Sequence, residues 1–125
     1  RGGGLVLAGL SGAGPAVGGA GTLRRMLIVS GIISVAPAHH DQMVELIGPL
    51  VAATVVEDGN LSYGFYADPS APGVFRVYEE WESPEAMGPH MASDHMATFL
   101  VGMGGLDVTG TELYQHEVTG TTRLM

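Results

Sequence analysis

The segment from Gly73 to Leu100 most constrains the fold, because a strand pattern within it passes directly into a helix signal. The residues from Val74 to Trp81 alternate between two faces, which predicts a half-buried strand. One of these faces carries Phe75, Val77, Glu79 and Trp81. The next residues, Ser83-Pro84-Glu85, suit a helix start, with serine as the cap and proline at the first helical position. Aromatic, carboxylate and imidazole side chains are concentrated in this segment, so we expect most of any site to lie there.

The preceding residues predict two strands and a helix. Met26 to Val35 is a β-branched apolar run, typical of a strand covered on both faces. Ala38 to Glu57 repeats apolar residues at helical spacing, and Asn60 to Ala67 alternates as a strand does. Because the turn from Asp68 to Gly73 is dense in proline and glycine, this second strand should form an antiparallel hairpin with the third.

The following residues predict two short helices and a last strand. The first helix should end near His90, with a break at Ala92-Ser93. A second helix, capped by Ser93 or Asp94, should turn its apolar residues inward. These inward residues are Met96, Phe99, Leu100 and Met103. Thr109 to Val118 alternates again and is predicted to be the last strand.

The order β-α-β-β-α-β predicts an α+β, ferredoxin-like fold, with a four-stranded antiparallel sheet and helices on one face. The apolar first strand requires cover on the other face too, so we expect a homodimer or a higher homo-oligomer. The predicted domain spans 26–118, with a polar tail over 119–125. Residues 1–25 are glycine-rich and contain no acid, which indicates a flexible leader or an added segment outside the working domain.

The charge balance excludes several partners. Thirteen acidic residues oppose only two arginines from Met26 onward, a net charge of −11. Nucleic acid and anionic membranes need a basic surface, so neither is expected as a partner. The chain has no cysteine, and no apolar run approaches the ~18 residues of a membrane span. We therefore expect a cytoplasmic protein without a thiol nucleophile.

Three motifs carry a family resemblance. They are the D-P-x-x-P-G-x-F turn from Asp68 to Phe75, the Y-E-x-W-E-S strand end from Tyr78 to Ser83, and H-x-x-S-x-H-x-x-x-F from His90 to Phe99. With them, the chain from about Met26 to Val118 resembles the antibiotic biosynthesis monooxygenase (ABM) family, which includes proteins assigned as quinol monooxygenases. The resemblance implies a dimeric α/β barrel. It also implies oxygenation of a small electron-rich aromatic (a hydroquinone, phenol or anthrone) with molecular oxygen as co-substrate and no cofactor.

A haem-degrading branch of similar proteins uses an asparagine on strand one, a tryptophan in the short helix and a later histidine. The matching positions here hold Gly31, His90 and Leu100. The resemblance therefore does not extend to haem degradation.

Cofactor-free oxygenation needs a base, an apolar pocket and hydrogen-bond donors for the developing oxyanion. His95 is the first candidate for the base and His90 the second, because histidine titrates near neutrality without tuning. The predicted substrate-binding residues are Tyr66, Glu79, Trp81, Phe99 and Tyr114. Trp81 is better explained as a core residue, and the alternative for His95 is a histidine satisfied by its own helix or by a backbone carbonyl.

No metal site is predicted. His90 and His95 are five residues apart across a helix break, unlike the i, i+4 pair of a helical metal site. His39-His40-Asp41 lies at a helix start and is expected to be solvated. Two alternatives to a monooxygenase stay open: a non-catalytic small-molecule-binding or stress-response dimer, and an isomerase or cyclase that needs no oxygen.

Overall fold

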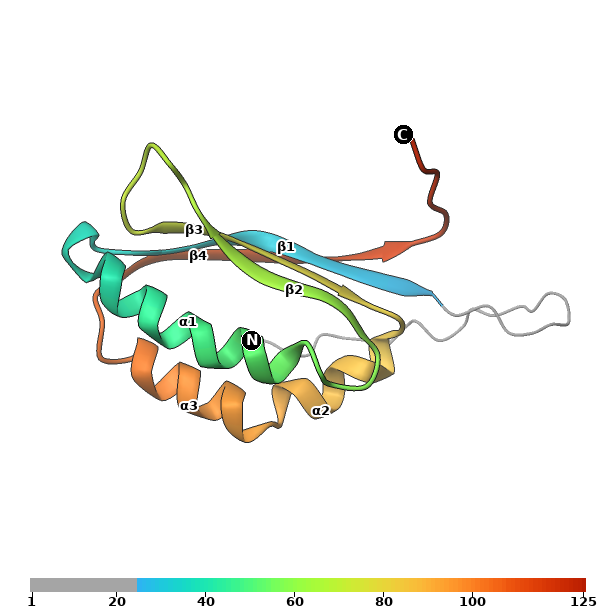
Figure 1. Cartoon of the computed structure of the whole chain (residues 1–125), viewed down its shortest axis with the longest axis horizontal. Helices are drawn as coiled ribbons and strands as arrows, with labels where there is room; N and C mark the ends of the chain where they lie inside the picture. The colour runs from blue at the N-terminus through green and yellow to red at the C-terminus, as the bar shows by residue number, and fades with distance from the viewer. Residues whose placement is uncertain (1–24) are drawn as a thin grey trace, which may run out of the picture.

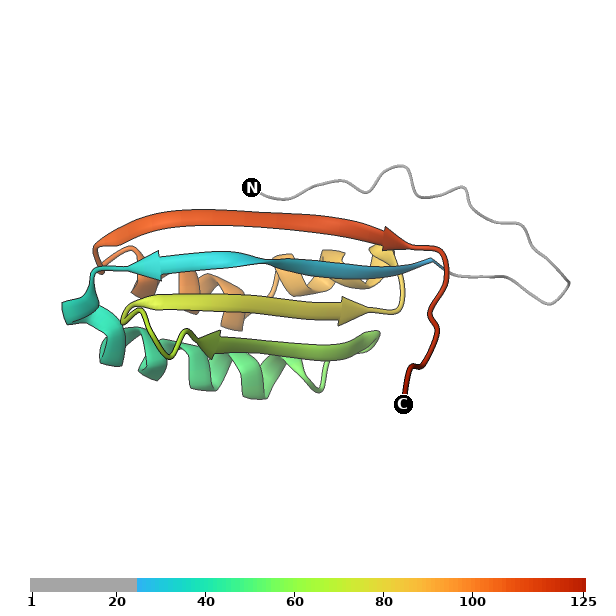
Figure 2. The same ribbon diagram turned by 90° about the horizontal axis from the view of Figure 1, so that it is seen from above.

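The computed structural model describes residues 25–125, which form a four-stranded antiparallel sheet with helices on one face (Figure 1). The strands are β1 (Met26–Val35), β2 (Asn60–Ala67), β3 (Val74–Trp81) and β4 (Val108–Val118). They lie in the order β2-β3-β1-β4, as the view onto the sheet shows (Figure 2). This order confirms the predicted ferredoxin-like α+β fold. Of the predicted leader, residues 1–24 lie outside the described part, and Arg25 forms an ion pair with Glu117 at 2.6 Å.

The helices lie together beneath the sheet (Figure 1). They are α1 (His40–Thr54), α2 (Met87–Met91) and α3 (Asp94–Met103), with short 3-10 helices at Pro37–His39 and Pro84–Ala86. The first helix ends at Thr54, three residues before the predicted end, so Glu57 lies in the following turn. Gly59 in this turn has a φ of +84°, a conformation that favours glycine. None of the described helices is long and apolar enough to cross a membrane.

The core lies between the helices and the facing side of the sheet. Residues of β1 alternate between buried and half-buried, and those of β3 alternate in step with them. The buried apolar residues include Leu27, Val35, Met43, Leu50, Phe75, Val77, Trp81 and Phe99. Leu100 was predicted to point inward, but 47% of its surface is exposed. Successive helical residues point about 100° apart, and Phe99 takes the position that faces Phe65 on the sheet.

The opposite side of the sheet is open, since no helix among residues 25–125 covers it (Figure 1). Strand β1 presents Ile28 and Ile32 there, both only half-buried. Tyr66 and Tyr114 lie on this open face from the neighbouring part of the sheet and are exposed. An apolar strand with one uncovered face is unusual for an isolated domain.

Candidate functional site

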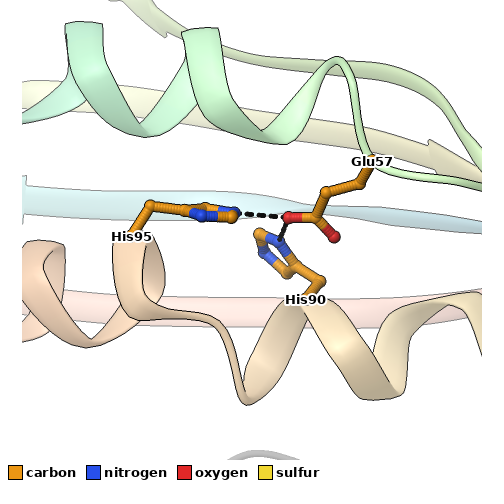
Figure 3. A group of neighbouring side chains, drawn as sticks. All are labelled: Glu57, His90 and His95. Atoms are coloured by element: carbon orange, nitrogen blue, oxygen red, sulfur yellow. Dashed lines mark hydrogen bonds and ion pairs between the residues drawn. The ribbon is translucent and has the colours of Figure 1, made fainter.

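Two histidines converge on one carboxylate beneath the sheet (Figure 3). Glu57 Oε2 lies 3.0 Å from His90 Nδ1 and 2.5 Å from His95 Nε2. The His90 side chain is 1% exposed, that of Glu57 15% and that of His95 25%. The site therefore extends from a dry interior position at His90 to a position at His95 that solvent can reach.

The break between α2 and α3 brings the two imidazoles together. Ser93 caps α3 by accepting a hydrogen bond from the backbone N–H of Met96, and its hydroxyl donates to the carbonyl of His90 at 2.7 Å. One serine thus stabilises both sides of the break. The rings of His90 and His95 consequently lie 6.0 Å apart, despite a spacing that would separate them on a continuous helix.

The turn that follows α1 places Glu57 opposite the two histidines. Its N–H donates to the carbonyl of Thr54 at 2.9 Å, and its own carbonyl accepts from the N–H of Asn60 at 3.2 Å. Gly59 passes close to the start of the α2 region, where an added Cβ would lie 2.6 Å from the Cβ of Ala86. The turn is therefore packed directly against the segment that carries the histidines.

His90 is enclosed by aromatic rings. Its ring centroid lies 5.0 Å from that of Trp81 and 5.2 Å from that of Tyr63. Burial lowers the pKa of His90, although the hydrogen bond to Glu57 acts in the opposite direction. Burial also favours the neutral form of Tyr63: it raises the pKa of the phenol, which stays protonated at neutral pH. His90 is therefore a buried imidazole rather than a solvent-exposed base.

Glu79 is a second buried carboxyl group close to this cluster. The indole N–H of Trp81 donates to Glu79 Oε1 at 2.9 Å. The two residues lie on the same face of β3, two positions apart, which brings their side chains together. Burial raises the pKa of Glu79 to about 7, and the negative charge of Glu57 adds to the rise.

The predicted substrate-binding residues fall into two groups. Glu79, Trp81 and Phe99 are buried on the helix side of the sheet, and Trp81 contacts His90 directly. Tyr66 and Tyr114 lie on the open face instead, so the structure does not bring them to the histidines. The hydroxyl of Tyr114 donates to Glu112, which raises the pKa of the phenol.

The histidine pair at the start of α1 is not simply solvated, as we had expected. His40 Nδ1 accepts a hydrogen bond from the N–H of Gly73 at 2.9 Å, and its ring stacks on Phe75 at 4.9 Å. His39 Nδ1 accepts from the N–H of Asp107, also at 2.9 Å. The two histidines thus bind the loops at Gly73 and Asp107, at the end of α1 that is far from Glu57.

Sequence reasoning missed Glu57, because 33 and 38 residues separate it from its two histidine partners. One signal was present. Glu57 lies just past the C-terminal end of a helix, where the helix dipole disfavours a carboxylate unless it has a partner with N–H or positive charge.

The positions compared with haem-degrading proteins do not suit that chemistry. Gly31 lies so close to β4 that an added Cβ would be 2.0 Å from the carbonyl oxygen of Glu112, so an asparagine would not fit there. His90 is surrounded by core aromatics, and Leu100 points largely to solvent. All three observations agree with the sequence-based exclusion of haem degradation.

The Glu57–His90–His95 cluster can support two kinds of chemistry. A carboxylate that accepts the N–H of an imidazole orients the ring and leaves the other ring nitrogen as a base. The same three side chains offer one ligand atom each, and these atoms lie within 4.8 Å of one another. The cluster thus also has the composition of a two-histidine, one-carboxylate metal site.

Solved structures share this fold. A candidate antibiotic biosynthesis monooxygenase of Deinococcus radiodurans matches with a TM-score of 0.73 and 28% identity, over 79% of this chain and 98% of that one. The protein PA3566 of Pseudomonas aeruginosa matches with a TM-score of 0.72 and 24% identity, over 80% of this chain and all of that one.

Sequence comparisons point to the same group of proteins as the structural matches. An uncharacterised protein of Synechocystis, sll1783, is 24% identical over 98 residues, which cover 78% of this chain and 67% of that protein. The sequence profile described as antibiotic biosynthesis monooxygenase matches residues 26–101, from the first residue of β1 into α3. The matched region contains the three cluster residues and all three sequence motifs, and the chain therefore belongs to the antibiotic biosynthesis monooxygenase family.

Proposed function

We propose that the protein is a cofactor-independent monooxygenase that acts on a small electron-rich aromatic such as a hydroquinone, phenol or anthrone. The observation that carries this proposal is the contact between Glu57 and His95, at the part of the cluster that solvent reaches. The carboxylate accepts the Nε2 proton, so the lone pair of His95 is on Nδ1. His95 then serves as the general base and Glu57 orients it.

The reaction needs no external reductant when the substrate is a hydroquinol. His95 Nδ1 accepts the hydroxyl proton, and the resulting anion donates electrons to O2. A C–O bond forms, and the hydroperoxide loses water to leave a hydroxyquinone. One oxygen atom enters the product, the other leaves as water, and the substrate supplies all the electrons. Trp81 and Glu79 would bound the inner wall of the site.

The test is oxygen uptake by chelator-treated protein with a panel of hydroquinones and anthrones. With 18O2, we expect one labelled atom in the product. His95→Ala should lower the rate about 100-fold or more, the usual contribution of a general base. His39→Ala is a matched control at the far end of α1 from Glu57 and should leave the rate unchanged. No uptake above buffer, or an unaltered rate in His95→Ala, would reject the proposal.

A second candidate is a non-catalytic small-molecule-binding dimer of the same fold. It is favoured by the aromatic contacts around His90, since Trp81 and Tyr63 occupy the space beside its ring. Saturable binding of an aromatic ligand without oxygen uptake would select this alternative. Turnover that proceeds equally well under nitrogen would instead identify an isomerase or cyclase.

We also propose that a second copy of the chain covers the open face of the sheet. The support is the half-buried Ile28 and Ile32 beside exposed Tyr66 and Tyr114. In this arrangement the two tyrosines are interface residues rather than substrate ligands. Sedimentation analysis should give twice the chain mass, and Ile32→Glu should shift it to the monomer. The domain limits of 26–118 and the cytoplasmic location stay predictions.

A further inference from the structure

We propose that Glu57, His90 and His95 form a binding site for one divalent first-row transition-metal ion, with Zn2+ as the representative ion. The ligand atoms are Glu57 Oε2, His90 Nδ1 and His95 Nε2, which lie within 4.8 Å of one another. The site does not rest on the proposed oxygenation, because an ion can bind whether or not the protein turns over a substrate.

The geometry is close to that of a bound ion. With metal–ligand bonds of about 2.0–2.2 Å, tetrahedral ligands lie about 3.3 Å apart. The carboxylate oxygen is already 3.0 Å from His90 Nδ1 and 2.5 Å from His95 Nε2. An ion would therefore need Glu57 to withdraw by less than about 1 Å and the two imidazole nitrogens, which lie within 4.8 Å of each other, to close to about 3.3 Å. Glu57 can do so, because it lies in a turn rather than within a helix.

The donor set selects the class of ion. Two imidazoles and one carboxylate suit Zn2+, Fe2+, Ni2+ or Cu2+, whereas Mg2+ and Ca2+ prefer oxygen ligands throughout. Three protein ligands also leave a coordination position open for water or substrate.

The surrounding structure holds the ligands in place. Trp81 and Tyr63 restrict the ring of His90 on two sides, and Ser93 fixes the chain between the two histidines. The three ligands come from the turn after α1, from α2 and from α3 (Figure 3). A bound ion would thus join three segments of the chain, and it should raise the melting temperature.

Metal binding and base catalysis exclude each other at this site. His95 uses Nε2 as a metal ligand in one case and as the N–H donor to Glu57 in the other. A bound ion would therefore remove the carboxylate contact that orients His95 as a base. If the protein is a cofactor-free oxygenase, Zn2+ should inhibit it.

The experiment uses the full chain without a histidine tag, stripped of metal by chelator and then dialysed. Calorimetric titration with ZnCl2 should give one ion per chain with a micromolar or tighter dissociation constant, and MgCl2 should give no heat of binding. Co2+ should produce the visible absorption of a low-symmetry site with nitrogen and oxygen ligands. The melting temperature should rise with Zn2+ concentration.

Three variants locate the site. His95→Ala and Glu57→Gln should each weaken Zn2+ binding at least tenfold, whereas His116→Ala should bind as the wild type does. Circular dichroism checks that each variant is folded; Glu57→Gln keeps a side chain of the same size in case His95→Ala does not fold. No Zn2+ binding by the wild type, or equal binding by the wild type and both site variants, would overturn the inference.

The outcomes for the two proposals are separable. Zn2+ binding without oxygen uptake supports the metal site and rejects the oxygenase. Oxygen uptake by metal-free protein that binds no Zn2+ supports the oxygenase and rejects the metal site.

Discussion

Glu79→Gln tests whether a buried carboxyl group makes the stability of this protein depend on pH. Glu79 is only 6% exposed, and burial raises its pKa from 4.5 to about 7. Between these two values the folded state binds more protons than the unfolded state. Stability from this group is therefore complete below pH 4.5 and is lost as the pH rises through about 7.

The size of the effect follows from the shift in pKa. Each unit corresponds to 1.36 kcal/mol, so the shift of Glu79 is equivalent to about 3 kcal/mol between acidic and alkaline pH. Glutamine does not titrate, and its amide oxygen can still accept the hydrogen bond from Trp81. We therefore expect Glu79→Gln to match the wild type near pH 4.5 and to exceed it by about 2–3 kcal/mol at pH 8.

The assay is urea unfolding at several pH values, followed by the fluorescence of Trp81, the single tryptophan of the chain and fully buried. Chelator keeps metal ions from altering the charge near Glu79, and a constant protein concentration removes the effect of association. The difference between variant and wild type isolates Glu79 from the other titrating groups. A difference that stays constant with pH, or that favours the wild type at pH 8, would refute the reasoning.

Three further predictions concern stability. His40→Ala should cost about 1–2 kcal/mol, because the N–H of Gly73 loses its acceptor; urea unfolding measures the loss. Gly31→Ala should destabilise by more than about 3 kcal/mol or prevent soluble expression, since its Cβ would overlap β4. Ser93→Ala removes a helix cap and should lower the melting temperature by an amount equivalent to about 1 kcal/mol.

Local chemistry made the elements of this fold predictable. The β-branched run at Met26–Val35 and the alternation at Val74–Trp81 are strands with those limits in the structure. Ser93 was predicted to cap a helix and does so. Leu100 was wrongly placed inward, because the apolar stripe of α3 is broad and only the packing of Phe99 on Phe65 decides the orientation of the helix.

The sequence by itself determined the order of the strands and helices and the turns between them, because these depend on residues within a few positions of one another. It also drew attention to His90 and His95. Only the tertiary structure decided what these histidines contact. Glu57 reaches them because a turn after α1 packs against a helix break more than 30 residues later. No local pattern encodes such a contact. The strand register likewise places Tyr66 and Tyr114 on the opposite side of the sheet from the cluster, which the sequence did not show.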